Sequence, residues 1–282
     1  MIDVGFFIGH ESYSDQAQLL VSTFTTHHKA KIDFQLHAMV PSHIRFACRI
    51  EKVLVHRFDV PQAYRSIPFV DKMLGAAAFE SICDFRYLWL DVDSCFFSAI
   101  PDITFHHIMA NPVDKRNIGI LVNTPKSRLW ELLDTYFSCN STDYPPVTTL
   151  ISKERILPYW NAGMVLAHVN TGIFSLTARA LQNLLAMAKV RSLFVNDKLT
   201  ELFFHQAVYS FTLLRSCPDG VAPLPYGMNY PLHLLHEDTS PPPLADVISI
   251  RYDNYFTQRK APDIYKQVFS AYQDKLKPYW YY

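Results

Sequence analysis

Tyr87-Leu88-Trp89-Leu90-Asp91-Val92-Asp93 is an apolar run that ends in two carboxylates spaced i, i+2. Because alternate side chains of a strand point to the same side, Asp91 and Asp93 should converge where the strand leaves a sheet. Hard oxygen ligands at such a point suit Mg²⁺ or Mn²⁺, which proteins usually bind with one or two carboxylates together with substrate phosphates. The spacing alone also fits two solvated loop acids that end a buried strand.

The residues before this run alternate between strand and helix patterns. Short apolar runs at 4–9, 34–40 and 52–58 predict strands, because glycine or proline bounds each of them. Apolar residues recur with helical spacing at 17–24 and again at 69–82, where Lys72 and Glu80 lie away from the apolar stripe. Alternating strands and helices favour a mostly parallel sheet, whose ligands bind outside the carboxyl ends of the strands. The two aspartates are expected at such an end.

The residues after the run continue the α/β pattern. We expect a strand at 117–122, a helix at 127–137, a long surface loop at 138–158, and a strand that begins near Tyr159 and includes Asn161-Ala162-Gly163. The small residues of that strand would allow the backbone to approach a ligand closely. Helices are expected at about 172–188 and 196–214, the second with Asn196 as its N-cap. We predict a single domain over residues 1–282 with a C-terminal extension from about residue 240.

Composition narrows the class of protein. Lys plus Arg and Asp plus Glu number 26 each, and aromatic residues do not alternate with basic ones, so the chain lacks the electrostatic pattern of nucleic-acid binding. Five cysteines, an odd number without a close pair, indicate a reducing compartment. We find neither a basic, apolar leader nor an apolar stretch long enough for a membrane span. We therefore expect a soluble, cytoplasmic protein; its oligomeric state is left open.

The order of these features resembles that of nucleotide-sugar glycosyltransferases with the GT-A fold. The resemblance is greatest to glycosyltransferase family 8, which contains glycogenin and the bacterial lipopolysaccharide galactosyltransferases. Its motifs correspond here to a helix with Lys72, then YLWLDVDSCFFSAIP, WNAGMVLAHVN, FFHQAVYSF and PLPYGMNYP, within residues 4–256. The first two motifs are fairly specific in combination, and the later ones are weak singly.

The resemblance implies a fold and a reaction. The fold would be α/β, with a Rossmann-like, mostly parallel central sheet flanked by helices. The reaction would move a sugar from a nucleoside-diphosphate sugar, most simply a UDP-sugar, to the hydroxyl of an unidentified glycan, lipid or small-molecule acceptor. Mn²⁺ or Mg²⁺ would be the cofactor, and the anomeric configuration would be retained.

The resemblance also implies residue roles. Asp91 and Asp93 would bind the metal that bridges the diphosphate, and Lys72 would approach the phosphates or the sugar. Lys72, His205 and Gln206 would form the catalytic group. The residues expected to bind the nucleotide sugar are Phe7, Tyr13, Asp91, Val92, Asp93, Asn161, Ala162, Gly163 and Arg251.

Two departures from the family pattern affect these roles. The family has an acid before the late-helix glutamine, where this chain has His205. The family takes a third metal ligand from a late-strand histidine, where this chain has Arg251, whose guanidinium cannot ligate a cation but can contact phosphate. His233 or His236 would then be the third ligand, or water would fill the position. Residues 276–280 are similar to a family tail that closes over the diphosphate.

Other functions are also compatible with parts of this sequence. A haloacid-dehalogenase-type phosphohydrolase also has Asp-x-Asp after a strand, but Cys95 stands where that motif has Thr or Val. A sugar nucleotidyltransferase would need a glycine-rich, arginine-containing loop, which residues 5–13 lack. A non-catalytic nucleotide-sugar-binding protein is compatible with both departures. If the reaction inverts configuration, Glu201 and His205 are the candidate bases.

Overall fold

The computed structural model describes residues 1–46, 50, 52–101, 107–195, 197–217 and 220–253. Its α-helices are α1 (Ser14–His28), α2 (Val70–Glu80), α3 (Arg128–Phe137), α4 (Ile173–Ala186), α5 (Ala188–Phe194) and α6 (Lys198–Ser216). Its strands are β1 (Ile2–Phe7), β2 (Phe34–Pro41), β3 (Val53–Phe58), β4 (Arg86–Leu90), β5 (Ser94–Phe96), β6 (Ile108–Pro112), β7 (Val147–Thr148), β8 (Arg155–Ile156), β9 (Trp160–His168), β10 (Tyr230–Pro231) and β11 (Ser249–Arg251). Short 3₁₀ turns include η1 (Glu11–Tyr13) and η5 (Leu232–Glu237).

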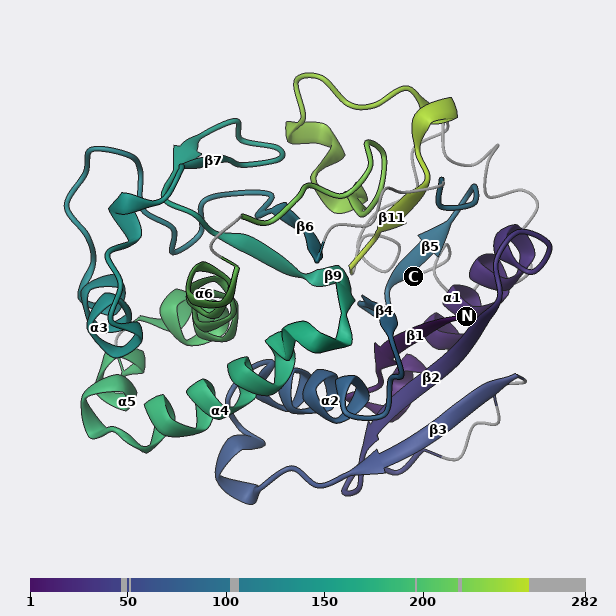
Figure 1. Cartoon of the computed structure of the whole chain (residues 1–282), viewed down its shortest axis with the longest axis horizontal. Coiled ribbons are helices and arrows are strands. Elements are labelled where there is room, and N and C mark those ends of the chain that lie inside the picture. The colour runs from purple at the N-terminus through teal and green to yellow at the C-terminus, as the bar shows by residue number, and fades with distance from the viewer. Residues whose placement is uncertain (47–49, 51, 102–106, 196, 218–219, 254–282) are drawn as a thin grey trace.

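A six-stranded sheet runs through the molecule in the order β3-β2-β1-β4-β9-β6 (Figure 1). β3, β2, β1 and β4 are parallel, whereas β9 is antiparallel to both of its neighbours, β4 and β6. A smaller sheet, β10-β11-β5, begins immediately after Asp93. The predicted α/β class with a mostly parallel central sheet is confirmed.

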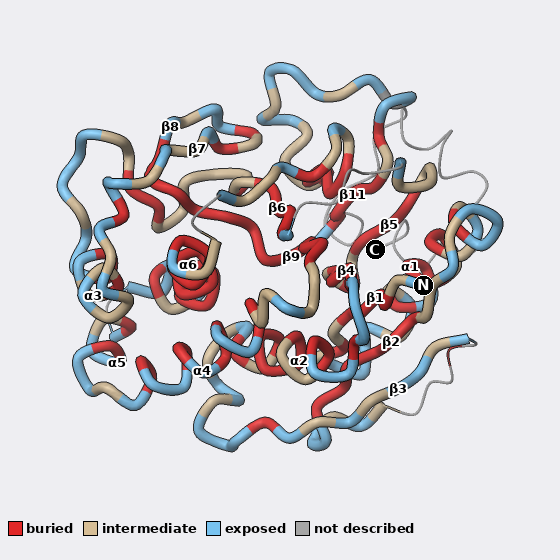
Figure 2. The backbone as a smooth tube through the Cα atoms, in the orientation of Figure 1, coloured by how far each residue is buried: buried red, intermediate tan, exposed pale blue. Residues whose placement is uncertain are grey.

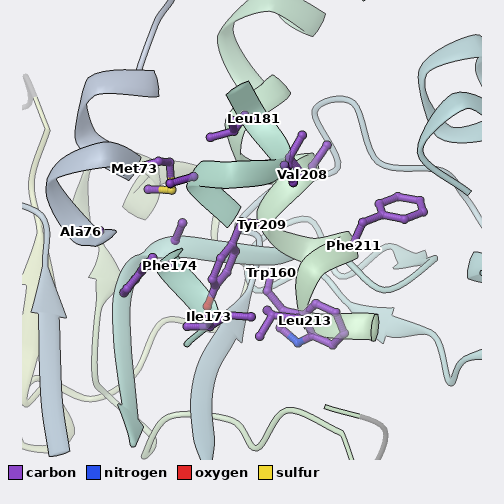
Figure 3. Close-up of a cluster of buried hydrophobic side chains, with 14 of the residues drawn as sticks. Met73, Ala76, Trp160, Ile173, Phe174, Leu181, Val208, Tyr209, Phe211 and Leu213 are labelled. Carbon is purple, nitrogen blue, oxygen red and sulfur yellow. The ribbon is translucent and has the colours of Figure 1, made fainter. Parts of the chain in front are cut away.

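Strand alternation divides the core into two layers. In β4, Tyr87 and Trp89 pack on the side covered by α2, α4 and α6, whereas Leu88 and Leu90 pack with residues of α1 on the other side. Buried residues follow β4, β9 and α6 (Figure 2). Residues of α2, α4 and α6, among them Met73, meet in one hydrophobic cluster (Figure 3). The strand before the aspartates is therefore fixed from both sides.

The structure differs from the sequence prediction at the sheet edge. Residues 117–122 do not form the expected strand, because Asn117 adopts a positive φ and the Gly119 amide closes a turn on the Arg116 carbonyl. β6 takes the edge position instead. The loop at 138–158 contains the β7–β8 hairpin. Asn196 and residues 276–280 lie outside the described residues; Asp197 caps α6 by accepting a hydrogen bond from the Thr200 amide.

Within the described ranges, no helix has both the length and the apolarity needed to cross a bilayer.

Candidate functional site

A cavity of about 600 Å³ opens at the carboxyl ends of β1 and β4. It is lined by Phe7 at the end of β1, by Asp91 and Asp93 after β4, and by side chains of α2, β9, α6, η5 and β11. This is the place at which open α/β sheets bind ligands. Elements far apart in the sequence therefore meet at the aspartate pair.

The cavity brings together nearly all of the predicted site residues. Those that line it are Phe7, Tyr13, Lys72, Asp91, Val92, Asp93, Asn161, Gly163, His205, Gln206, His233 and Arg251. Ala162 does not line the cavity, because alternation along β9 turns its side chain into the hydrophobic core while Asn161 and Gly163 face the opening. Glu201 is also absent from the lining and pairs with Lys198.

Asp91 is held by its backbone and by a lysine. Its amide donates to the Gly163 carbonyl at 2.7 Å, and its carboxylate forms an ion pair with the Lys72 ammonium. Lys72 is buried although it lies away from the main apolar stripe of α2, because the cavity and Asp91 receive its side chain. A Cβ on Gly163 would lie 2.2 Å from Asp91 Oδ2, so only glycine leaves room for this carboxylate.

The surroundings of Asp93 disfavour its ionised form. Its Oδ2 accepts a hydrogen bond of 2.7 Å from the Asp253 amide. Burial and the negative charge of Asp91 raise the pKa of the Asp93 carboxyl to about 7, against the opposing charge of Arg251. A further positive charge beside the pair would stabilise both carboxylates in their ionised form.

The charges of the cavity favour a cation. Its lining contains five aspartates against two lysines and one arginine, an excess of two acidic groups when the histidines are neutral. These residues are Asp71, Asp91, Asp93, Asp114 and Asp253 against Lys72, Lys115 and Arg251. Among the described residues, no three His, Cys, Asp or Glu side chains are gathered as a metal-binding group. The carboxylates of Asp91 and Asp93 fit a divalent ion that takes phosphate or water as its further ligands.

Of the two histidines in η5, His233 lines the cavity, whereas His236 is not among its lining residues. Within the described part of the chain, the buried Nδ1 of His233 has no hydrogen-bond partner. Burial and the neighbouring Arg251 charge lower the pKa of the imidazole, which favours the neutral form that metals bind.

Arg251 is buried at the end of β11 and forms an ion pair with Asp114. Burial alone would lower the pKa of Arg251, but the negative charges of Asp114, Asp91 and Asp93 outweigh this effect and raise the pKa above its ordinary value. Asp114 follows β6, a strand that the sequence analysis did not predict, and no sequence signal indicated this partner. A permanent positive charge from β11 therefore acts on the aspartate pair, in addition to that of Lys72.

His205 lies in α6 with its ring 4.8 Å from the ring of Phe69, and its Nδ1 is 3.1 Å from the Leu202 carbonyl oxygen. Burial and the charge of Lys72 lower the pKa of His205 to about 3. The imidazole is therefore neutral at pH 7 and is a weak base.

Several lining residues were missed by the sequence analysis. Asp71 adjoins Lys72 and accepts the Lys72 amide hydrogen; burial raises the pKa of its carboxyl. The others include Gln16, Phe69, Lys115, Asn117, Leu202, Phe203 and Asp253. Of these residues, Asp71 and Asp253 could have been suspected from the sequence, because they lie within two residues of Lys72 and Arg251.

Comparison with known proteins identifies solved structures that share the fold of this chain. No family model matches the chain, and no curated protein sequence matches it. Among solved structures, the galactosyltransferase LgtC in complex with donor and acceptor sugar analogs matches with a TM-score of 0.54 and 12% identity over 96% of each chain. An active-site mutant of LgtC matches with a TM-score of 0.53 at the same identity and coverage. The chain therefore has the GT-A fold of these galactosyltransferase structures.

Proposed function

We propose that this protein is a metal-dependent glycosyltransferase that moves a sugar from a nucleoside-diphosphate sugar, a UDP-sugar, to an acceptor hydroxyl. The observation that carries the proposal is the meeting of Asp91 and Asp93 with Lys72, Asn161 and Arg251 in one cavity at the carboxyl ends of the strands. The similar LgtC structure, which holds donor and acceptor sugar analogs, supports the same chemistry.

Asp91 and Asp93 would hold Mn²⁺ or Mg²⁺, with His233 as the candidate nitrogen ligand. When bound, the ion would offset the negative charge that develops on the departing diphosphate. Lys72 and Arg251 are the two cationic side chains of the cavity that interact with the aspartate pair. Lys72 would contact phosphate or sugar as a point charge, and the planar fork of Arg251 would orient a phosphate.

The remaining lining residues divide between the two halves of the donor. Phe7, Tyr13 and Val92 all line the cavity and would border the nucleotide. Tyr13, in η1, is exposed enough for its ring to contact the base. Asn161 and Gly163 would border the sugar, because the amide of Gly163 already donates to Asn161 Oδ1 at 2.6 Å and fixes that side chain. Gln206 also lines the cavity, and one of the similar LgtC structures is an active-site mutant in which glutamate replaces glutamine.

The transfer would retain the anomeric configuration. The acceptor oxygen bonds to the anomeric carbon, the bond from that carbon to the diphosphate oxygen breaks with its electron pair on the diphosphate, and the hydroxyl proton passes to the departing phosphate. This course needs no separate base. The low pKa of His205, and the fact that Glu201 does not line the cavity, both argue against an inverting base.

Incubation with a panel of nucleotide sugars and Mn²⁺ tests the proposal. A transferase releases free sugar and nucleoside diphosphate slowly even without acceptor, and Asp93→Ala should abolish that release while the fold is retained. Phosphate release from phosphomonoesters would indicate the phosphohydrolase instead. Tight binding without turnover would indicate a non-catalytic nucleotide-sugar-binding protein. The presence of His205, where the family has an acid, is compatible with that alternative.

The single domain over residues 1–282 and the cytoplasmic location stay predictions from the sequence. β11, which follows residue 240, pairs with β5 and delivers Arg251 to the cavity, so this part of the chain contributes to the proposed site.

A further inference from the structure

We propose that the acceptor carries an apolar group beside its receiving hydroxyl, and that an apolar wall formed by Phe69, Leu202 and Phe203 binds this group. The inference rests on the proposed transferase function and specifies the substrate class of the same cavity. All three side chains line the cavity, from the residue before α2 and from the first turns of α6.

The apolar wall reaches the outer surface along α6. Leu199, Leu202 and Phe203 are spaced i, i+3 and i+4, so they share one helix face. Leu199 is 47% exposed and Leu202 is 36% exposed, whereas Phe204, one residue on, is fully buried in the core. The first turns of α6 thus have one apolar face in the core and a second one in the open, which an ordinary surface helix does not have.

Phe69 joins the apolar wall to the charged end of the cavity. Its ring centroid lies 5.8 Å from the Lys72 ammonium, which pairs with Asp91. Phe69 is 43% exposed and has a φ of +61°, a left-handed conformation that a bulky residue rarely adopts. Backbone strain of this kind concentrates at ligand-binding positions. An acceptor that places its hydroxyl near the polar end would therefore have its adjoining group against Phe69.

The chemistry of the apolar wall selects an apolar occupant. Phenylalanine and leucine side chains offer no hydrogen bond, so sugar hydroxyls placed against them would lose water without a partner. An alkyl or aryl group gains instead, by about fourfold in affinity for each methylene that it buries. A lipid chain and an aromatic aglycone share this property.

Matched glycosides test the inference. Methyl, octyl and phenyl glycosides of each of several sugars are compared as acceptors, with the octyl compounds below their micelle concentration and with acceptor-free donor hydrolysis measured in parallel. We expect KM to be at least ~10-fold lower for the octyl or phenyl compound than for the methyl compound. A gain for octyl alone indicates a lipid-like acceptor, and a gain for phenyl indicates an aromatic one.

Leu202→Ser should reduce this preference to less than about threefold, because it removes the methyl groups that the occupant contacts. Leu176→Ser is the matched control. Leu176 is 39% exposed on α4 and does not line the cavity, so its variant should keep the full preference.

A binding measurement covers the case in which no sugar of the panel is an acceptor. With UDP and Mn²⁺ present, saturation-transfer NMR on octyl glucoside should show saturated alkyl protons for the wild type and for Leu176→Ser, and a loss for Leu202→Ser. Equal KM values for methyl and octyl or phenyl glycosides, or undiminished alkyl saturation in Leu202→Ser, would overturn the inference. If the protein does not hydrolyse any donor, the proposed transferase function is contradicted. The NMR experiment still tests whether the apolar wall binds an alkyl group.

Discussion

Gly163 leaves the space that the Asp91 carboxylate occupies. The Asp91 amide donates to the Gly163 carbonyl, and any Cβ at this position of β9 would lie 2.2 Å from Asp91 Oδ2. A strand that is antiparallel to β4 thus determines where the first aspartate of the pair can lie. The sequence analysis predicted that Gly163 lines a sugar pocket. The structure gives a second reason for a glycine here, because a larger residue would displace the Asp91 carboxylate.

Gly163→Ala should therefore move the Asp91 carboxylate and break its pairing with Lys72. We expect the rate of donor hydrolysis to fall by about 100-fold or more, because misplacing a catalytic group by about an ångström costs that much. Circular dichroism should show a folded protein. Wild-type hydrolysis in this variant would contradict the assigned position of Asp91.

Lys72→Met removes the ammonium that pairs with Asp91 in the cavity. Removing one preorganised donor that stabilises developing negative charge, as in an oxyanion hole, typically costs a factor of about 100 to 1,000 in kcat, and we expect a loss of that order here. The matched control is Lys126→Met, because Lys126 forms a comparably enclosed ion pair with Asp134 outside the cavity lining. Its variant should lose stability and keep kcat; an equal loss of kcat in both variants would indicate a merely structural role for Lys72.

Arg251→Gln should leave the partly buried Asp114 carboxylate without its partner. Removing one member of a fully buried ion pair costs about 3–5 kcal/mol of stability, so the loss for this partly buried pair should lie at or below the lower end of that range. The double variant Arg251→Gln/Asp114→Asn should recover most of that loss in urea unfolding, because no uncompensated charge remains. Its KM for the donor should nevertheless stay raised, since the phosphate contact is gone. Recovery of both stability and donor KM would show that Arg251 serves only the fold.

His28, which lies away from the cavity, should make the free energy of unfolding decrease in acid. It lies fully buried near the end of α1, where Nδ1 donates to the Phe24 carbonyl and Nε2 accepts from the Ile100 amide, so the ring is neutral. Burial lowers the pKa of His28 to about 4. The unfolded chain binds this proton near pH 6.5, so the stability that is present above that pH is lost as the pH falls toward 4, by up to about 3 kcal/mol.

Urea unfolding at pH 7.5, 6 and 5 measures this loss. His28→Gln, whose amide oxygen can still accept from Ile100, should be destabilised at neutral pH but should show a shallower decline with acid. The difference between the two pH profiles isolates the His28 contribution from that of other groups. Identical slopes for wild type and variant would show that His28 does not bind the proton.

Much of the site could be predicted because strand periodicity is explicit in the sequence. Alternation in a strand that follows an apolar run brings Asp91 and Asp93 to one edge, and the βα order makes that edge the ligand side. The same alternation in β9 separates Ala162, which packs in the core, from its neighbours Asn161 and Gly163, which line the cavity; the family motif, which groups the three residues, does not show this difference.

The rest depends on tertiary contacts that no local pattern encodes. Lys72 lies off the apolar stripe of α2, a position usually solvated, and its burial depends on Asp91 from another element. Asp114 reaches Arg251 only because β6, a strand with little apolar patterning, takes the sheet edge in place of residues 117–122. Phe69 reads from the sequence as an ordinary apolar residue before a helix.

Anomalous diffraction from a crystal grown with UDP and Mn²⁺ would locate the metal relative to the two aspartates. We expect one manganese peak in the cavity, bonded to carboxylate oxygens of Asp91 and Asp93 and to both phosphates of UDP, with the nucleoside toward Tyr13. Manganese bound elsewhere, or UDP bound with neither aspartate near its phosphates, would contradict this expectation.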